Sequence, residues 1–230
     1  MARAMTLQTR AMVRFGIGAV ISAAMLFLPA GSLRYWQGWM FLVVTWGFLF
    51  PAVLYLAKHD PQLMERRLRV REKEREQQLF KVVASLIYFP AFLLPGLDFR
   101  FGWSRAWLDP VPLGVVLVAQ AVTLAGYGLA FWVMRVNAFA SRTIQVEPGQ
   151  EVVSIGPYAI VRHPMYAGMV LIMLATPLVL GSYVAFPFFA LMVPLLAYRL
   201  INEERVLRRD LAGYAEYCER VRFRLVPGVW

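Results

Sequence analysis

The chain has 230 residues, of which 60% are hydrophobic, and its mean hydropathy is +0.56. A soluble domain is closer to half apolar, and here the excess is gathered into long uncharged runs of the kind that a bilayer requires. The formal net charge is +10. However, the basic residues stand in short segments between apolar runs, and no polar domain remains to present a surface to nucleic acid. The composition therefore predicts an all-α integral membrane protein in contact with the lipid bilayer, and it excludes a nucleic-acid-binding protein.

The residues that bind metals in proteins are scarce in this chain. Cys218 is the only cysteine, so neither a disulfide framework nor a thiolate cluster is expected. His59 and His163 are the only histidines, and no acidic cluster stands beside either of them. We therefore expect no metal site.

About six transmembrane helices are expected, because a span needs about 20 mostly apolar residues. The basic N-terminus runs into an apolar segment without a clear cleavage site, which favours a retained first span over a signal peptide. Only Gly181, Ser182 and Tyr183 separate the last two spans, which predicts a helical hairpin. Trp36, Trp39, Trp103 and Trp107 stand near span ends, as in an aromatic belt. The expected spans are 13–33, 36–57, 79–97, 111–136, 166–180 and 184–201.

The basic residues predict which ends of these spans face the cytosol. With a cytosolic N-terminus and six spans, 21 of the 24 Lys and Arg residues fall in the cytosolic segments 1–14, 58–81, 135–165 and 199–230. Arg34, Arg100 and Arg105 are the other three. This asymmetry is a strong positive-inside signal. It favours an even number of spans and a multi-pass protein with both termini in the cytosol.

The segment 58–81 carries eight basic and five acidic residues. It predicts a charged cytosolic helix with i,i+4 pairs such as Glu65 and Arg69, and we expect a solvated connector at the anionic leaflet rather than a direct role in substrate capture. We divide the chain into N-terminal transmembrane helices in 1–110, including this connector, and a functional core in 111–230.

Polar and turn-forming residues gather between the fourth and fifth spans and continue into the fifth. Pro164 suits the first turn of a helix, which places Arg162 and His163 at a helix N-terminus that favours an anionic group. Arg199 and Glu203 are four residues apart and therefore share one face of the last span. The alternative to a functional role is that Arg199 and Glu203 form a structural ion pair, with Glu204 in water. Because the hairpin is short, we expect His163, Tyr166, Arg199 and Glu203 to meet at one cytosolic rim.

Several motifs in roughly residues 120–230 resemble the isoprenylcysteine carboxyl methyltransferase family and its broader prokaryotic membrane-methyltransferase relatives. The resemblance rests on the combined pattern, because single pieces such as His-Pro-x-Tyr are weakly specific. The pattern consists of Gly156-Pro157-Tyr158, Arg162-His163-Pro164-x-Tyr166-x-Gly168, Arg199-x-x-x-Glu203-Glu204, Gly213-Tyr214-x-x-Tyr217 and Arg224-Leu225-Val226-Pro227-Gly228-Val229-Trp230.

The resemblance implies a cytosolic pocket for S-adenosyl-L-methionine, formed by the loop before the hairpin and by the hairpin ends. It assigns Arg199 to the substrate side and Glu203 to the cofactor. Glu204 is a second candidate catalytic residue, a spare carboxylate that with His163 could serve as a base. The remaining cofactor-binding residues that it implies are Gln145, Gln150, Val152, Val153, Tyr158, His163, Pro164, Met165 and Tyr166.

The sequence favours methyl transfer to a lipophilic or amphipathic acceptor, most of all carboxyl methylation of a prenylcysteine-like substrate. Phospholipid and small-thiol acceptors remain open alternatives. An NADPH-dependent lipid reductase is another, because such enzymes resemble this chain around His163–Tyr166. A transporter or other non-enzymatic membrane protein is disfavoured, because no span carries a charge at mid-depth.

Overall fold

The computed structural model describes residues 5–68, 75–140 and 144–230, and every regular element in these ranges is a helix. Most of the elements are long α-helices, which follow the apolar runs of the sequence, and the rest are short helices in the connections. In chain order they are α1 (Leu7–Ala30), α2 (Trp36–His59), α3 (Pro61–Leu68), α4 (Arg75–Phe101), η1 (Ser104–Ala106), α5 (Leu113–Val136), η2 (Gly156–Ala159), α6 (Pro164–Val179), α7 (Phe186–Ala190), α8 (Met192–Asp210) and α9 (Tyr214–Arg220).

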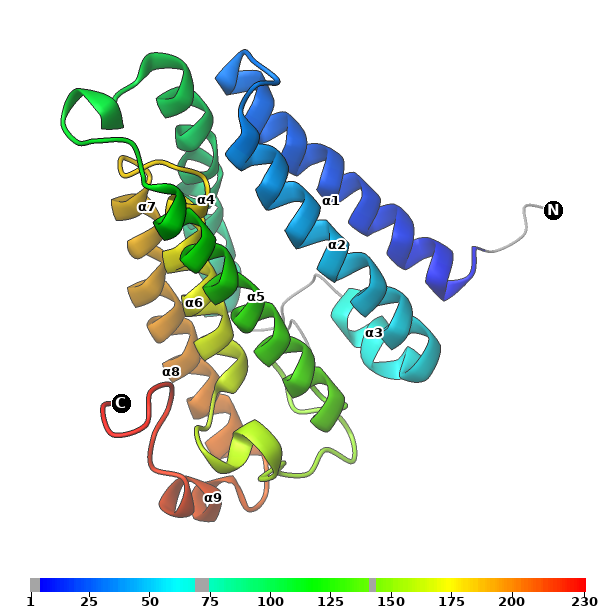
Figure 1. Ribbon diagram of the computed structural model, residues 1–230. Coiled ribbons are helices and arrows are strands. Elements are labelled where there is room, and N and C mark those ends of the chain that lie inside the picture. The colour runs from blue at the N-terminus through cyan, green and yellow to red at the C-terminus, as the bar shows by residue number, and fades with distance from the viewer. Residues whose placement is uncertain (1–4, 69–74, 141–143) are drawn as a thin grey trace.

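The long helices form an up-and-down bundle (Figure 1). The short helices α3 and α9 lie at one end, together with the connection between α5 and α6, and we call this the α9 end. The turn between α1 and α2, the connection between α4 and α5, and the turn between α6 and α7 lie at the opposite end (Figure 1). The segments that are richest in charge therefore share the α9 end.

The structure has five helical segments that are long and apolar enough to cross a membrane: Leu7–Ala30, Trp36–His59, Gln78–Phe101, Leu113–Val136 and Phe186–Asp210. The expected count of six is not confirmed by helix length, because α6 has only 16 residues. At 1.5 Å per residue it covers about 24 Å, less than the roughly 30 Å of hydrocarbon. The last span is longer than predicted, since its charged end continues as helix to Asp210.

Within the described residues, the connector 58–81 is not the single charged helix that its sequence predicted, because α2 ends at His59 with Asp60 as its C-cap and α3 (Pro61–Leu68) follows as a separate helix. The expected pair of Glu65 with Arg69 lies outside the described residues, and Glu65 Oε1 instead accepts a bond from Arg10 Nη2 at 3.2 Å. Helix α3 is also attached to the end of α5.

Two arginines make this attachment. Arg66 Nη1 donates to the carbonyl of Ala138 at 2.8 Å, and Arg67 Nη1 donates to that of Ala140 at 2.9 Å. The Arg66 guanidinium also lies over the ring of Phe139, 4.7 Å from its centroid. These contacts hold the first residues of the α5–α6 connection against the N-terminal half of the chain.

Helices α5 and α6 cross closely at a pair of glycines. A Cβ atom at Gly126 would lie 2.7 Å from the carbonyl oxygen of Gly168, and a Cβ at Gly168 would lie 2.8 Å from that of Gly126. Within a bilayer such small residues let backbones approach and gain van der Waals contact. Gly168, the last residue of the Arg162–Gly168 motif, therefore has a packing role.

A buried carboxylate fixes the opposite end of the hairpin. Asp98, near the end of α4, accepts a bond from the backbone N–H of Ser104 at 2.7 Å. Its other oxygen accepts from the hydroxyls of Ser104 and Ser182. Tyr35 also donates to the carbonyl of Leu180 at 2.5 Å. The α6–α7 turn is thereby joined to α4 and α2, and this sets the position at which α7 and α8 start back towards the α9 end.

Candidate active site

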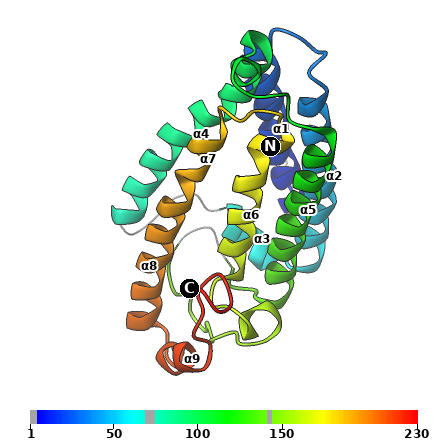
Figure 2. The ribbon, with the colours of Figure 1, turned by 60° about the vertical axis from the view of Figure 1, so that its left-hand side comes forward.

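The α9 end contains a cavity of about 580 Å³ between α4, α6, α8 and the α5–α6 connection. This volume lies within the range of small-molecule and cofactor sites. Figure 2 shows α8 and α6 on opposite sides of this region, with α9 below them. The polar residues on its wall come from these elements and from α3 and α9: Arg67, Lys81, Ser85, Tyr88, Asn137, Gln145, Gln150, Glu151, Tyr158, Arg162, His163, Tyr166, Arg199, Glu203, Tyr214 and Tyr217.

Helices α6 and α8 meet at a polar contact in this cavity. The Tyr166 hydroxyl donates to Glu203 Oε2 at 2.6 Å. One helical turn before Glu203, the guanidinium of Arg199 lies 5.0 Å from the ring centroid of Phe80 on α4. A carboxylate and a guanidinium thus face one cavity, as the sequence predicted. Each lies on a helix, which holds a site more accurately than a loop does.

The neighbouring carboxylate, Glu204, is buried in a cationic cluster behind the cavity wall. Its Oε1 accepts from Arg162 Nε at 2.7 Å and lies 3.2 Å from His163 Nε2. Its Oε2 accepts from Arg224 Nε at 3.0 Å. A buried carboxylate is tolerated when it is paired and hydrogen-bonded in this way. The cluster joins α8, the start of α6 and the segment after α9.

The segment after α9 also holds the backbone of the Arg162–Gly168 motif. The backbone N–H groups of Arg162 and His163 donate to the carbonyls of Phe223 and Arg224, both at 2.9 Å. The Arg162 guanidinium donates to the carbonyls of Val221 and Arg222, also at 2.9 Å. The Arg162 side chain therefore binds protein groups, and it joins the start of α6 to α8 and to the segment after α9.

The loop side of the cavity is closed by bonds around a turn at Pro148 and Gly149. The backbone N–H of Glu147 donates to Gln150 Oε1 at 3.0 Å, and the Gln150 N–H donates to the Glu147 carbonyl at 3.0 Å. The Gln145 side chain donates to the Glu147 carboxylate. Gln145 and Gln150 are thus brought together on the wall, and Val152 and Val153 follow them.

Tyr158 is held at both its hydroxyl and its backbone. Asn137 Nδ2 donates to the Tyr158 hydroxyl at 2.9 Å, and the Tyr217 hydroxyl donates to the Tyr158 carbonyl at 2.7 Å. Burial raises the pKa of Tyr158 to about 12, and the nearby Glu203 carboxylate adds to this. The phenol is therefore neutral at physiological pH, and its ring can serve as a stacking surface or as a partner for a cation.

Every site residue predicted from the sequence, with one exception, lies on the wall of this cavity. The exception is Glu204, which is placed behind the wall. The residues on the wall are Gln145, Gln150, Val152, Val153, Tyr158, His163, Pro164, Met165, Tyr166, Arg199 and Glu203.

The sequence did not predict that the N-terminal half would contribute to the wall. Helix α4 supplies Phe80, Lys81, Ala84, Ser85, Tyr88 and Phe89, and α3 supplies Arg67, whose Nη1 lies 3.6 Å from Met165 Sδ. A signal was present: Lys81, Ser85 and Tyr88 follow one another at i, i+4 and i+7, which places polar groups on one face of an apolar span.

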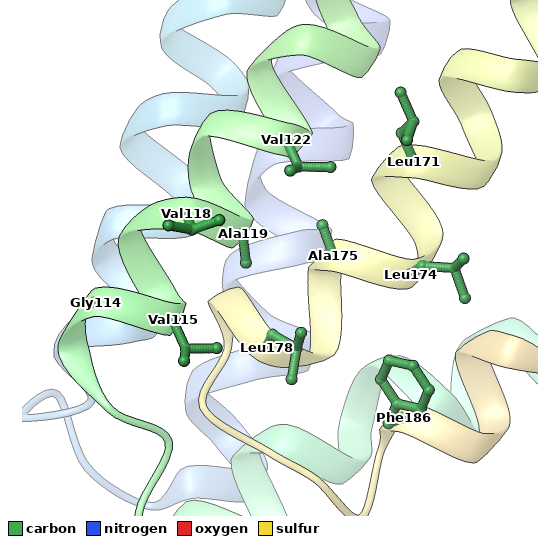
Figure 3. A pocket seen from close by; sticks show the side chains of 10 residues that line it. All are labelled: Gly114, Val115, Val118, Ala119, Val122, Leu171, Leu174, Ala175, Leu178 and Phe186. Atoms are coloured by element: carbon green, nitrogen blue, oxygen red, sulfur yellow. The ribbon is translucent and has the colours of Figure 1, made fainter.

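A second hollow, of about 440 Å³, lies between α5, α6 and the start of α7 (Figure 3). Apart from Gly114, its wall consists of apolar side chains, among them Val118, Val122, Leu171 and Leu174. It lies within the segments that can cross a membrane, where an apolar surface suits contact with lipid. Without polar groups to orient a ligand, it does not resemble a cofactor site.

Groups of three or more His, Cys, Asp or Glu side chains that could hold a metal ion do not occur among the described residues. The two acidic groups of the cavity wall, Glu151 and Glu203, come from separate segments.

Comparison with known proteins gives a family match in the second half of the chain. The isoprenylcysteine carboxyl methyltransferase (ICMT) family model matches residues 116–209. Protein-S-isoprenylcysteine O-methyltransferase B of Arabidopsis thaliana is 27% identical over 145 residues, 62% of this chain and 66% of that protein. YpbQ of Bacillus subtilis (strain 168) is 33% identical over 98 residues, 42% and 56% of the two chains. Delta(14)-sterol reductase TM7SF2 of Mus musculus is 32% identical over 91 residues, 38% of this chain but 22% of the reductase.

The whole fold also has a counterpart among solved structures. The eukaryotic intramembrane Ras methyltransferase ICMT superposes with a TM-score of 0.55 at 17% sequence identity, covering 87% of this chain and 68% of the other. At this identity the similarity shows the fold alone. Residues 116–209 thus match the isoprenylcysteine carboxyl methyltransferase family model, and the chain is a multi-pass integral membrane protein with an ICMT-like fold.

Proposed function

We propose that this protein is an S-adenosyl-L-methionine-dependent methyltransferase that acts at the membrane on an amphipathic acceptor and methylates the carboxylate of a prenylcysteine-like molecule. The observation that carries the proposal is the juxtaposition of Glu203, Tyr166 and Arg199 in one cavity of the family-matched segment. The orientation with this cavity and both termini in the cytosol is part of the proposal and is supported by the distribution of basic residues.

The groups on the cavity wall fit this cofactor. Glu203 can accept hydrogen bonds from an ammonium group or a ribose hydroxyl, and His163 at the start of α6 lies where a carboxylate would be favoured. Tyr158 offers an aromatic face, and Val152, Val153 and Met165 offer apolar surface for a nucleoside. When bound, the cofactor supplies an electrophilic methyl group on a sulfonium ion.

The chain's own task in such a reaction is mainly to position the acceptor, because in-line displacement depends on orientation. Arg199 can hold an anionic acceptor through charge-assisted hydrogen bonds. A carboxylate or thiolate acceptor needs no general base. An amine acceptor does need one, and Glu204, the candidate base, is already bonded to Arg162, His163 and Arg224. This favours an anionic acceptor over a phospholipid amine.

The similarity to a sterol reductase supports a second candidate, reduction of a membrane lipid with NADPH. The match to that reductase spans 38% of this chain and 22% of the reductase, whereas the methyltransferase family model matches residues 116–209, which supply Glu203, Tyr166 and Arg199. Methyl transfer therefore remains the better fit. Incubation with NADPH distinguishes the two candidates, since only a reductase oxidises it.

The proposal is tested with protein purified in detergent. Calorimetry should show binding of S-adenosyl-L-methionine and of its demethylated product, with no binding of NADPH. Transfer of a labelled methyl group is then measured with prenylcysteine, phospholipid and thiol acceptors. The absence of both heat and thermal shift with either form of the cofactor would sink the proposal.

Two substitutions separate the expected roles of the α8 residues. Glu203→Ala should weaken cofactor binding by roughly tenfold or more, as expected for a lost charge-assisted bond. Arg199→Ala should leave cofactor affinity within about twofold while turnover falls by roughly 10²-fold, the cost of losing a substrate-positioning group. Glu219→Gln on the exposed face of α9 serves as the control. Equal cofactor affinity in wild type and Glu203→Ala would refute this division of labour.

A further inference from the structure

The cavity wall has different chemistry on its two sides. The α5–α6 connection supplies Gln145, Gln150 and Glu151, which are polar. Helices α4, α6 and α8 supply a largely apolar side: Phe80, Ala84, Tyr88, Phe89, Met169, Met173, Met192 and Leu196. Methionine side chains adapt to irregular apolar ligands. An amphipathic molecule would therefore place its tail between α4, α6 and α8.

Lys81 stands at the start of this apolar side. It lies on the cavity wall one residue after Phe80, whose ring lies under the Arg199 guanidinium. The apolar span of α4 begins at Gln78, so Lys81 is near its charged end, whereas Tyr88 is seven residues deeper. At 1.5 Å per residue this is a depth difference of about 10 Å.

The charges of the cavity wall favour an anion at this position. Among the described residues, the wall carries the basic side chains Arg67, Lys81, Arg162 and Arg199 and the carboxylates Glu151 and Glu203. Arg162 is bonded to the buried Glu204. A bound cofactor with a sulfonium, an ammonium and one carboxylate adds net positive charge. A protonated amine would add more, whereas an anionic head group would lower the electrostatic energy.

We infer that Lys81 is a specificity-determining residue, which together with Arg199 binds the anionic head group of the acceptor at the α9 end of α4. The acceptor's apolar tail then runs along α4 past Ala84 towards Tyr88 and Phe89. This inference rests on the proposed function and selects, among its acceptors, an amphipathic anion such as a carboxylic acid over an aminophospholipid. Its particular content is a contribution from the N-terminal half, outside the family-matched segment.

The test measures acceptor kinetics and cofactor affinity for the full-length protein in detergent. The probes are a farnesylated cysteine with a free carboxylate and phosphatidylethanolamine. Lys81→Met should raise KM for the carboxylate by roughly tenfold, about the effect of one charge-assisted hydrogen bond. Its kcat and its Kd for the cofactor should stay within about twofold. Lys81→Arg should restore most of the affinity, and Lys58→Met, at an exposed lysine of α2, should change nothing.

The outcomes distinguish this inference from the proposed function. A Lys81→Met variant with an unchanged KM for the carboxylate, in an enzyme that turns over, overturns the inference alone. Preferred methylation of phosphatidylethanolamine does the same. An equal loss of cofactor affinity would show that Lys81 acts on the cofactor and would also overturn it. A wild-type chain that neither binds the cofactor nor methylates an acceptor overturns the proposed function and this inference together.

Discussion

Glu203 and Glu204 are adjacent in the chain but have different surroundings. Successive residues of an α-helix point about 100° apart. Glu203 therefore faces the cavity and accepts a bond from Tyr166, whereas Glu204 faces Arg162, His163 and Arg224. The sequence identifies the pair but does not show which carboxylate faces which partner, because that depends on how α8 is rotated against α6. One acid is thereby available to a ligand, and the other stabilises the motif that surrounds the ligand.

Tyr166→Phe tests whether the hydroxyl prepares Glu203 for binding. The change removes the 2.6 Å bond to Glu203 Oε2 and keeps the buried ring. We expect the Kd for S-adenosyl-L-methionine to rise by roughly tenfold, because hydrogen bonds to charged groups contribute about 1.5–3 kcal/mol. Calorimetry measures it, and Tyr198→Phe, at an exposed tyrosine of α8, is the matched control. The same Kd in both variants would show that Glu203 is positioned without Tyr166.

At the scale of elements, hydropathy predicts the long helices well, because a bilayer imposes a strong length and composition requirement. The predicted span 36–57 corresponds closely to α2, and 111–136 to α5. Hydropathy alone does not predict where α8 ends. This helix continues beyond its apolar run because Asn202, Glu204 and Val206 are buried against protein.

The candidate site was predictable on the side where its residues form a continuous motif, and it was missed where they come from distant segments. Phe80 and Arg199 are more than 100 residues apart, and Arg67 and Met165 nearly so. No local pattern encodes such contacts. The polar face formed by Lys81, Ser85 and Tyr88 marks one side of α4, but only the packed bundle shows what that side contacts.

The glycine crossing of α5 and α6 gives a prediction about stability. Gly126→Ala places a Cβ 2.7 Å from both the Gly168 carbonyl oxygen and Ile172 Cγ1, so the helices must separate. Overpacking of this kind costs about 1–3 kcal/mol. Gly128→Ala on the same helix meets no atom within 4 Å, and a gain of about 0.5–1 kcal/mol in helix propensity is expected there.

Labelling of the Cys218 thiol can measure the change in stability of these two glycine variants. Burial raises the pKa of its thiol, and the side chain is 8% exposed. Alkylation requires an accessible thiolate, so a fluorescent maleimide should react mainly after unfolding. On heating at a fixed rate, Gly126→Ala should be labelled at a lower temperature than wild type, and Gly128→Ala at the same or a higher temperature. Identical labelling curves for the two variants would contradict the proposed role of the crossing.

For the whole molecule, the site depends on both halves of the chain. The family-matched segment supplies the motif, whereas α3 and α4 supply Arg67 and the wall opposite Arg199. The segment after α9 completes it by accepting backbone bonds from Arg162 and His163. The division into 1–110 and 111–230 stays a useful description of the sequence, but the cavity wall includes residues from both parts.

The arrangement of the bundle also gives a prediction about orientation. The described parts of the basic segments lie towards the α9 end (Figure 1), and by sequence these segments contain 21 of the 24 Lys and Arg residues. Exposed tryptophans lie towards both ends, with Trp36 and Trp107 at the opposite end and Trp132 near the end of α5, as expected for aromatic belts at both interfaces. The basic segments are what favour a cytosolic α9 end. They also require α6 to act as a crossing, although it is short, because α5 and α6 run in opposite directions (Figure 1).

Single cysteines in a Cys218→Ala background test this orientation. Asp109 lies between α4 and α5, Pro148 between α5 and α6, and Glu219 on α9, and all three are exposed. A membrane-impermeant maleimide added to intact cells should label Asp109→Cys. It should label Pro148→Cys and Glu219→Cys only after the membrane is permeabilised, because the positive-inside rule places both in the cytosol. Labelling of Pro148→Cys and Glu219→Cys from opposite sides would mean that α6 and α7–α8 do not both cross. The reverse pattern at all three sites would place the cavity outside the cytosol, away from its proposed cofactor.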